Sequence, residues 1–145
     1  MSIIKSIERA YSLLQERNWD TIYWAIDLHG TCIKSNYVSG EYEWINEDVK
    51  QCLQLIQSLP ESKTILWTSC YKEELYSILS FFNSQGLGFN FWNCNPNIQS
   101  TKTGCFDEKF YFSVLLDDKA GFDPDTDWKL IYEYLKNKKN DSKRS

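Results

Sequence analysis

Apolar blocks and amphipathic segments alternate along most of this chain of 145 residues. Short apolar blocks bounded by polar residues are typical of buried strands, and apolar residues that recur every three or four positions are typical of helices. The expected strands cover 22–27, 64–68, 89–92 and 111–116. The expected helices cover 2–17, a segment that Asn46 caps and Pro60 follows, a segment that Gly86 ends, and a segment that starts near Asp125.

This order of elements predicts an α/β fold, because strands that alternate with helices form a parallel sheet with covered faces. We expect a three-layer, Rossmann-like sheet with helices on both faces, in a single domain over 1–140. Right-handed crossovers bring the carboxyl ends of all strands to one edge of such a sheet. Outside the sheet we expect an extra N-terminal helix in 1–20, a polar and aromatic flap in 32–45, and a frayed tail in 136–145.

Composition and charge narrow the class of protein. Hydrophobic residues make up 42% of the chain and charged residues 25%, as in ordinary globular domains. The net charge of −4 offers no basic surface for the phosphates of a nucleic acid. The five cysteines lack the short spacing of a zinc or dithiol motif, so we expect free thiols in a reducing, cytoplasmic setting. No apolar run has membrane-spanning length, so a membrane is not expected as a partner.

Polar side chains gather where the expected strands end. Asp27 ends the first strand, Thr68 ends the second, Asp117 and Asp118 follow the last, and Lys109 comes just before that last strand. In an open parallel sheet these positions meet at the edge where ligands bind. Three converging carboxylates repel one another unless a cation lies between them, and an all-oxygen set favours Mg²⁺. A hydroxyl and a lysine beside that ion predict a phosphate site, and a carboxylate can itself attack phosphorus.

Taken in order, these residues resemble the four motifs of the haloacid dehalogenase (HAD) superfamily of phosphohydrolases. Asp27-Leu28-His29-Gly30-Thr31 resembles the first motif, Asp-x-Asp-Gly-Thr, and Leu66-Trp67-Thr68-Ser69 resembles the second. Lys109 resembles the third motif, with Lys102 as the alternative lysine, and Leu115-Leu116-Asp117-Asp118 resembles the fourth. The resemblance covers residues 23–123, and four motifs in the right order with strand contexts are more specific than any one of them.

The resemblance implies a role for each matched residue. Asp27 would be the nucleophile that forms an aspartyl-phosphate. The implied catalytic residues are Asp27, His29, Thr68 and Lys109. The implied Mg²⁺ ligands are Asp27, Asp117, Asp118 and the backbone carbonyl of His29. The implied phosphate-binding residues are Gly30, Thr31, Thr68, Ser69 and Lys109.

His29 departs from the first motif, in which a second Asp usually acts as general acid and base. Its backbone carbonyl can still serve the metal, so the substitution affects the proton relay alone. An imidazole, with an unperturbed pKa of about 6.5, is a competent acid–base group near neutrality. Two functions therefore remain open: a Mg²⁺-dependent phosphomonoesterase that uses His29 as its relay, and a binding or regulatory protein that has lost turnover but keeps the metal site.

Motif spacing predicts the surroundings of the site. Only 40 residues separate Asp27 from Thr68, and 40 separate Thr68 from Lys109. Each interval already holds a strand-to-helix crossover, which leaves no room for a cap domain. We therefore expect an open site, roofed by flap residues Tyr37, Tyr42 and Trp44, that accepts a phosphate on a larger molecule or a small molecule held between subunits of an oligomer. Of the tryptophans, we expect Trp44 to contact substrate and Trp24, Trp67, Trp92 and Trp128 to lie in the core.

Other interpretations receive less support. A phosphoacceptor receiver domain also gathers carboxylates, a hydroxyl and a lysine, but its acidic pair comes early in the chain and here the pair comes last. A nucleic-acid 3′-end phosphatase gains nothing from the acidic net charge. Two side chains stay undecided between function and local structure: Asp123 is either a turn residue or an accessory to the metal site, and Ser69 either contacts phosphate or caps the next helix.

Overall fold

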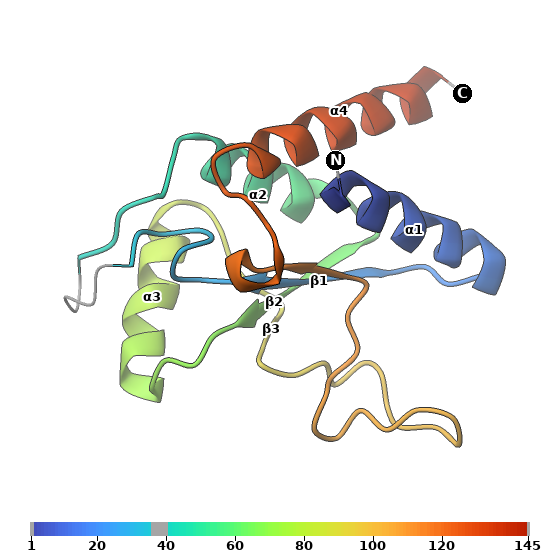
Figure 1. Ribbon diagram of the computed structural model, residues 1–145, viewed down its shortest axis with the longest axis horizontal. Helices are drawn as coiled ribbons and strands as arrows, with labels where there is room; N and C mark the ends of the chain where they lie inside the picture. The colour runs from blue at the N-terminus through green and yellow to red at the C-terminus, as the bar shows by residue number, and fades with distance from the viewer. Residues whose placement is uncertain (1, 36–40, 145) are drawn as a thin grey trace.

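The computed structural model describes residues 2–35 and 41–144, so the expected flap residue Tyr37 lies outside the described residues. Figure 1 shows the helices packed beside a twisted sheet. The helices are α1 (Ser2–Arg17), α2 (Asp48–Ser58), α3 (Lys72–Ser84) and α4 (Asp127–Arg144), with a short 3₁₀ helix, η1, at Asp118–Ala120. The strands are β1 (Ile22–Asp27), β2 (Ser62–Trp67), β3 (Phe91–Trp92) and β4 (Val114–Leu116).

The four strands form one parallel sheet in the order β3-β2-β1-β4. Strand β1 therefore lies between β2 and β4. The chain adds β2 and then β3 on one side of β1, and β4 pairs with the other side of β1. Asp27 pairs in register with Trp67, and Ile26 pairs with Leu116, so β1, β2 and β4 end at the same edge. The predicted α/β class is confirmed as a four-stranded parallel sheet flanked by helices, an arrangement compatible with a Rossmann-like fold.

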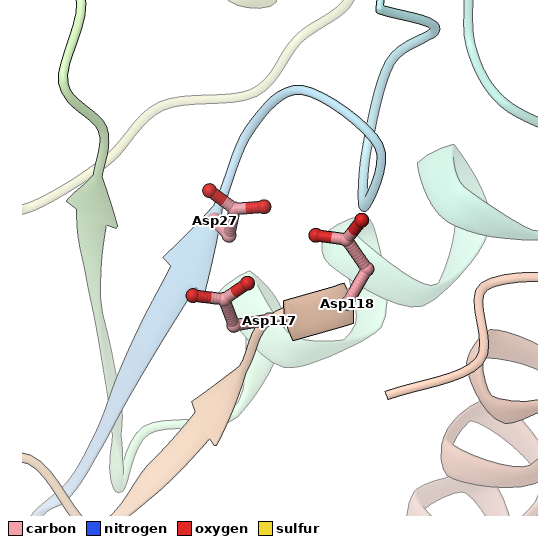
Figure 2. A group of neighbouring side chains, drawn as sticks. All are labelled: Asp27, Asp117 and Asp118. Carbon is pink, nitrogen blue, oxygen red and sulfur yellow. The ribbon is translucent and has the colours of Figure 1, made fainter. Parts of the chain in front are cut away.

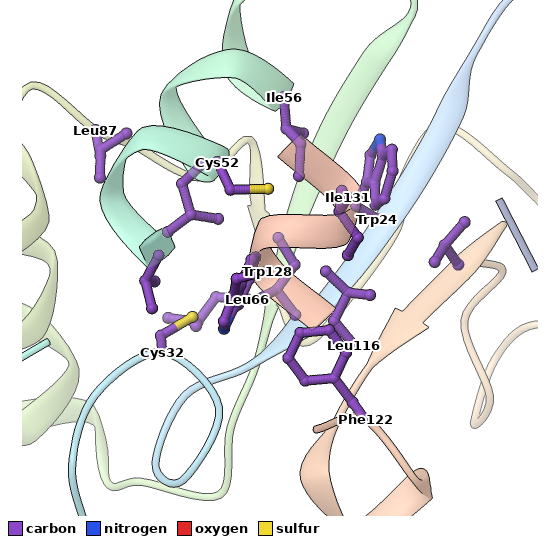
Figure 3. Packing of buried hydrophobic residues seen from close by; sticks show 14 of the residues in the cluster. Trp24, Cys32, Cys52, Ile56, Leu66, Leu87, Leu116, Phe122, Trp128 and Ile131 are labelled. Carbon is purple, nitrogen blue, oxygen red and sulfur yellow. The ribbon is translucent and has the colours of Figure 1, made fainter. Parts of the chain in front are cut away.

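One hydrophobic cluster joins buried residues of all four long helices to one face of the sheet. Alternate residues of β1 point into it, and Trp24 and Ile26 are fully buried there. Trp128 of α4 is also fully buried in this cluster, and its ring lies edge-on to Phe122 with centroids 5.0 Å apart (Figure 3). The polar edge of Trp24 is satisfied, because its Nε1 donates a hydrogen bond of 2.9 Å to Ser62 Oγ. The predicted burial of Trp24 and Trp128 is confirmed.

A loop meets the opposite face of β1. Tyr23 points to this side, and its ring lies edge-on to Tyr111 with centroids 6.2 Å apart. Tyr111 belongs to the segment 93–113, which connects β3 to β4 without a helix or strand. The expectation of helices on both faces is therefore wrong over β1, because the chain crosses this face as a loop. Trp67 and Trp92 also differ from expectation, since they are 42% and 36% exposed.

Strand and helix ends differ from prediction in ways that local contacts explain. The backbone N–H of Ser113 donates to Tyr23 O, and regular β4 begins only after this residue, because the preceding segment turns away toward the loop. Helix α4 continues through the segment expected to fray and ends at Arg144. Its last turns are not isolated: Leu135 is buried, and Lys138 Nζ lies 4.2 Å above the Tyr11 ring of α1.

The start of α2 agrees with the predicted cap. The Asp48 N–H donates 3.0 Å to Asn46 Oδ1, and the Asn46 amide donates 2.7 Å to the Pro124 carbonyl. One side chain thus caps α2 and ties it to the turn before α4.

All five cysteines are free thiols, as predicted. Burial raises the pKa of Cys32 and of Cys52, so both stay protonated at neutral pH. Among the helices of the described chain, none is both long and apolar enough to cross a bilayer.

Candidate functional site at the carboxyl edge of the sheet

Three carboxylates converge where β1 and β4 end. Asp27 is the last residue of β1, Asp117 directly follows β4, and Asp118 begins η1. One oxygen from each carboxylate lies within 4.8 Å of the others. Figure 2 shows the three side chains gathered at the tips of the two strands, below the loop that follows β1. Asp27 and Asp117 are partly buried and Asp118 is exposed, so the cluster opens to solvent on one side. The predicted meeting of these three residues is confirmed.

The loop after β1 is a tight turn built on one carbonyl. Leu28 O accepts hydrogen bonds from the N–H groups of Thr31, Cys32 and Ile33, at 2.9–3.3 Å. Gly30 has a φ of +81°, and its N–H donates to Ile33 O at 2.8 Å. A Cβ at Gly30 would lie 2.8 Å from Asp118 Oδ2. Both the positive φ and this close approach require glycine here.

Thr31 joins the two strand ends. Its hydroxyl donates to Asp27 Oδ2 at 2.9 Å and accepts the Asp118 N–H at 3.1 Å. The residue is fully buried, and Trp128 Nε1 donates 2.7 Å to its carbonyl. The N–H groups of Gly30 and Thr31 are hydrogen-bonded within the turn, and the Thr31 hydroxyl bonds to the two aspartates. Their predicted phosphate contacts stay predictions.

The carboxylate cluster perturbs Asp27. Burial, with a smaller contribution from the nearby Asp117 carboxylate and against the opposing Thr31 hydrogen bond, raises the pKa of Asp27 to about 6. The ionised form of Asp27 is therefore disfavoured when only protein charges are present. A cation among the three oxygens would reverse this effect.

We expect the metal-free protein to lose stability as Asp27 ionises. Because its folded pKa is raised above the ordinary 3.8, the stabilising effect of the protonated form is complete below about pH 4 and is lost as pH rises through about 6. In EDTA, the free energy of unfolding of Asp27→Asn relative to wild type should increase by about 1 kcal/mol between pH 4 and pH 7. This figure is reduced because Asp27 is partly exposed. Thermal melts at matched pH measure this difference. An unchanged difference from pH 4 to pH 7 would contradict the account.

Thr68 follows β2 at the same edge, where Asn93 holds it. The Thr68 N–H donates 2.9 Å to Asn93 Oδ1, and Asn93 Nδ2 donates 2.6 Å to Thr68 O. Asn93 has a φ of +51°, a conformation that asparagine tolerates better than most residues. The Thr68 hydroxyl accepts the Cys70 N–H at 3.3 Å. Sequence reasoning missed Asn93, for which the only signal was an asparagine directly after an expected strand.

Ser69 is exposed beside Thr68 and does not cap the next helix. Helix α3 begins after Tyr71, and no side chain caps it. The capping interpretation of Ser69 is therefore wrong, and its predicted phosphate contact stays a prediction. Asp123 is settled as a turn residue: its Oδ1 accepts the Asp125 N–H at 3.0 Å, outside the three-carboxylate cluster.

His29 is influenced by α3 rather than by the carboxylate cluster. Burial lowers the pKa of His29, and the Glu74 carboxylate of α3 partly offsets that effect. Glu74 also accepts a hydrogen bond of 3.4 Å from the Tyr42 hydroxyl of the flap. The net result is an imidazole that is neutral near pH 7 and able to accept a proton.

Trp44 packs on helix α3. Its ring lies against Phe81 and Phe82, with centroids 5.1 and 5.2 Å apart. Trp44 therefore anchors the described part of the flap to α3, and because it is only partly buried, its predicted substrate contact stays a prediction.

The two candidate lysines lie at different parts of the loop. Lys109 is exposed and precedes Phe110, whose ring packs 5.3 Å from Trp67, the register partner of Asp27. Lys102 lies between Thr101 and Thr103 at the other end of β1, beside a cavity of about 620 Å³. Lys109 is therefore better placed than Lys102. The cavity is lined mainly by aromatic and polar side chains: Arg17, Trp19, Thr21, Tyr23, Thr101, Thr103, Phe106 and Tyr111.

The fold and site define an α/β domain with a parallel sheet and an acidic cluster at its carboxyl edge. No protein-family model and no curated protein matches the chain. A solved structure of a conserved protein from Bacteroides thetaiotaomicron is similar, with 25% sequence identity and a TM-score of 0.62. The alignment covers 81% of this chain and 92% of that chain. The likeness supports the α/β architecture, and the description of that protein states no activity.

Proposed function

We propose that this protein is a Mg²⁺-dependent phosphohydrolase of the HAD type, which acts on phosphomonoesters through an aspartyl-phosphate on Asp27. The observation that carries the proposal is the convergence of Asp27, Asp117 and Asp118, whose oxygens lie within 4.8 Å of one another. Asp27 ends one strand and Asp117 follows another, 90 positions later in the chain. Their order along the chain and their meeting at one sheet edge both match the resemblance.

The donor set fits a hard divalent cation. All side-chain donors are carboxylate oxygens, which Mg²⁺ prefers, and they leave room for water and phosphate oxygens. The raised pKa of Asp27 is a second sign of fit, because burial, and to a smaller extent the Asp117 carboxylate, disfavours its ionised form, which a bound cation would stabilise. Asp27, Asp117, Asp118 and the His29 carbonyl would hold the ion, which would neutralise charge on the transferring phosphoryl group.

The chain's own residues supply the remaining chemistry. A carboxylate oxygen of Asp27 attacks phosphorus, the ester P–O bond breaks, and the leaving oxygen takes a proton from solvent water, to which His29 returns one at the end of the cycle. Thr31 fixes the Asp27 carboxylate for this attack through its 2.9 Å hydrogen bond. Thr68 and Lys109 hold the phosphoryl oxygens. Water then attacks the aspartyl-phosphate, His29 accepts its proton, and release of phosphate restores Asp27.

The elements around the site support an enzyme without a cap domain. Helix α2 and strand β2, with the turn between them, occupy the second half of the interval between Asp27 and Thr68, and Trp44 of the flap before them packs on α3. An open site of this kind suits a phosphate on a large or protruding substrate. We further propose a cytoplasmic location, which the five free thiols support.

Hydrolysis of para-nitrophenyl phosphate tests the proposal. Wild-type protein should release phosphate with Mg²⁺ present, and the rate should fall to background in EDTA and return when Mg²⁺ is restored. Protein that binds Mg²⁺ yet releases no phosphate from any ester tested would overturn the hydrolase and leave a metal-binding regulatory protein. The specific observation that favours this second function is that His29 stands where the matched motif has its second Asp, and that its pKa is affected by burial and by Glu74 of α3.

His29→Ala separates the relay from the metal site. Loss of the imidazole should lower kcat by about 10²-fold, the usual range for general acid–base catalysis. The Mg²⁺ affinity should stay within about twofold, because only the backbone carbonyl of residue 29 would contact the ion. Steady-state kinetics and Mg²⁺ titration measure the two effects. An unchanged kcat would show that His29 carries no proton in the reaction.

A further inference from the structure

Trp67 is an exposed aromatic residue beside the nucleophile. It ends β2 and pairs in register with Asp27 of β1, and register partners on neighbouring parallel strands point to the same face of a sheet. Neighbouring strands lie about 4.8 Å apart, so the bases of the two side chains are adjacent. The residue is 42% exposed, although the preceding Leu66 and Ile65 are fully buried. The exposed indole therefore lies beside the last residue of β1, on the same face of the sheet.

The surroundings hold the indole without covering it. Phe110 packs edge-to-face against Trp67, with ring centroids 5.3 Å apart and planes at 65°. Phe110 in turn contacts Phe112 at 6.0 Å, which ties the pair to the segment that leads into β4. A ring fixed by one edge contact has little freedom left to lose when a second ring stacks on it. The aromatic pair therefore forms a preorganised platform next to the carboxylate cluster.

We propose that Trp67 is a stacking platform that selects phosphomonoesters whose leaving group carries a planar aromatic ring. This inference rests on the proposed function and names its substrate class. The ring would lie one or a few bonds from phosphorus, because the platform is next to Asp27 along the sheet edge. Phenyl phosphate is the simplest member of the class. A nucleic-acid strand is disfavoured as the source of the ring, because the chain carries a net charge of −4.

Paired substrates and paired variants test the platform. Trp67→Ala should lower kcat/KM for phenyl phosphate about tenfold, mostly through KM, since ring stacking contributes roughly that factor. The same variant should change kcat/KM for ethyl phosphate by less than twofold, and Trp67→Phe should recover most of the phenyl phosphate value. Trp92→Ala is the matched control, because Trp92 is similarly exposed (36%) but pairs with Leu66 rather than with Asp27. Trp92→Ala should leave kcat/KM unchanged for both substrates.

Binding measurements separate this inference from the proposed function. Phenylphosphonate and methylphosphonate are not hydrolysed, so their affinities in Mg²⁺ can be measured by calorimetry whether or not the protein turns over. Tighter binding of phenylphosphonate to wild type than to Trp67→Ala, with equal methylphosphonate affinities, supports the platform even if no ester is hydrolysed. If Trp67→Ala lost affinity equally for phenylphosphonate and methylphosphonate, or for neither, the platform would be overturned. An adenosine monophosphate arm shows whether a ring on a longer linker also reaches Trp67.

Discussion

Asp27→Asn is expected to lower kcat for para-nitrophenyl phosphate by about 10³-fold or more, the usual cost of removing a nucleophile. The amide is nearly the same size as the carboxylate and can still accept the Thr31 hydroxyl, whose bond to Asp27 Oδ2 is 2.9 Å. It cannot form the acyl phosphate. The loss should therefore appear in kcat, and the variant should melt at or above the wild-type temperature in EDTA at pH 7.

The control for this variant is Asp123→Asn. Asp123 lies in the turn before α4, outside the carboxylate cluster, and an asparagine oxygen can still accept the Asp125 N–H. This variant should keep wild-type kcat and KM. Substantial residual turnover by folded Asp27→Asn would show that another group attacks phosphorus or that water does so directly.

Gly30→Ala is expected to weaken Mg²⁺ binding and to lower turnover by about 10²-fold, as small misplacements of catalytic groups do. The new Cβ would lie 2.8 Å from Asp118 Oδ2 and 3.3 Å from Asp118 Cγ, so the Asp118 carboxylate must shift from its present position in the cluster. The φ of +81° adds about 1–2 kcal/mol of backbone strain for an alanine. Mg²⁺ titration, turnover and thermal melts measure the three effects.

Gly86→Ala is the control that separates the effect of the Asp118 contact from the effect of backbone strain. Gly86 has a similar φ of +76°, but a Cβ there would meet no atom within 4 Å. It ends α3, away from the carboxylates. Both variants should therefore lose similar stability, and only Gly30→Ala should lose Mg²⁺ affinity. Equal Mg²⁺ affinities in the two variants would show that Asp118 tolerates displacement and does not hold the ion.

The sheet and the meeting of the carboxylates could be predicted because they depend on local patterns and on one topological rule. Ile22–Asp27 and Ser2–Arg17 have strong, complete apolar periodicity, and their bounds agree with the structure. Parallel pairing then places the residues after β1 and β4 at one edge whatever the loops do. Asp27, Asp117 and Asp118 are brought together by this rule alone, so their convergence needed no knowledge of side-chain contacts.

Contacts between distant segments could not be predicted from the same patterns. Whether Trp67 is buried or exposed depends on what covers its face, and the loop 93–113 has no periodicity that would reveal its course. The Thr31 hydroxyl could have faced a phosphate, but its position 2.9 Å from Asp27 and 3.1 Å from the Asp118 N–H is set by packing between strand ends. Helix α4 continues into the segment expected to fray, where Lys138 packs over Tyr11 of α1, a contact that composition does not disclose.

A structure of the protein soaked with Mg²⁺ and trifluoroberyllate, a mimic of the phosphoryl group on an aspartate, tests the central claim most directly. We predict beryllium bonded to an Asp27 carboxylate oxygen, and one Mg²⁺ held by Asp27, Asp117 and Asp118 within the cluster whose oxygens lie 4.8 Å apart or less. Asp27→Asn should bind no beryllium under the same conditions. Beryllium fluoride bonded to a different side chain, or a cluster that stays free of Mg²⁺ at millimolar concentration, would contradict the account.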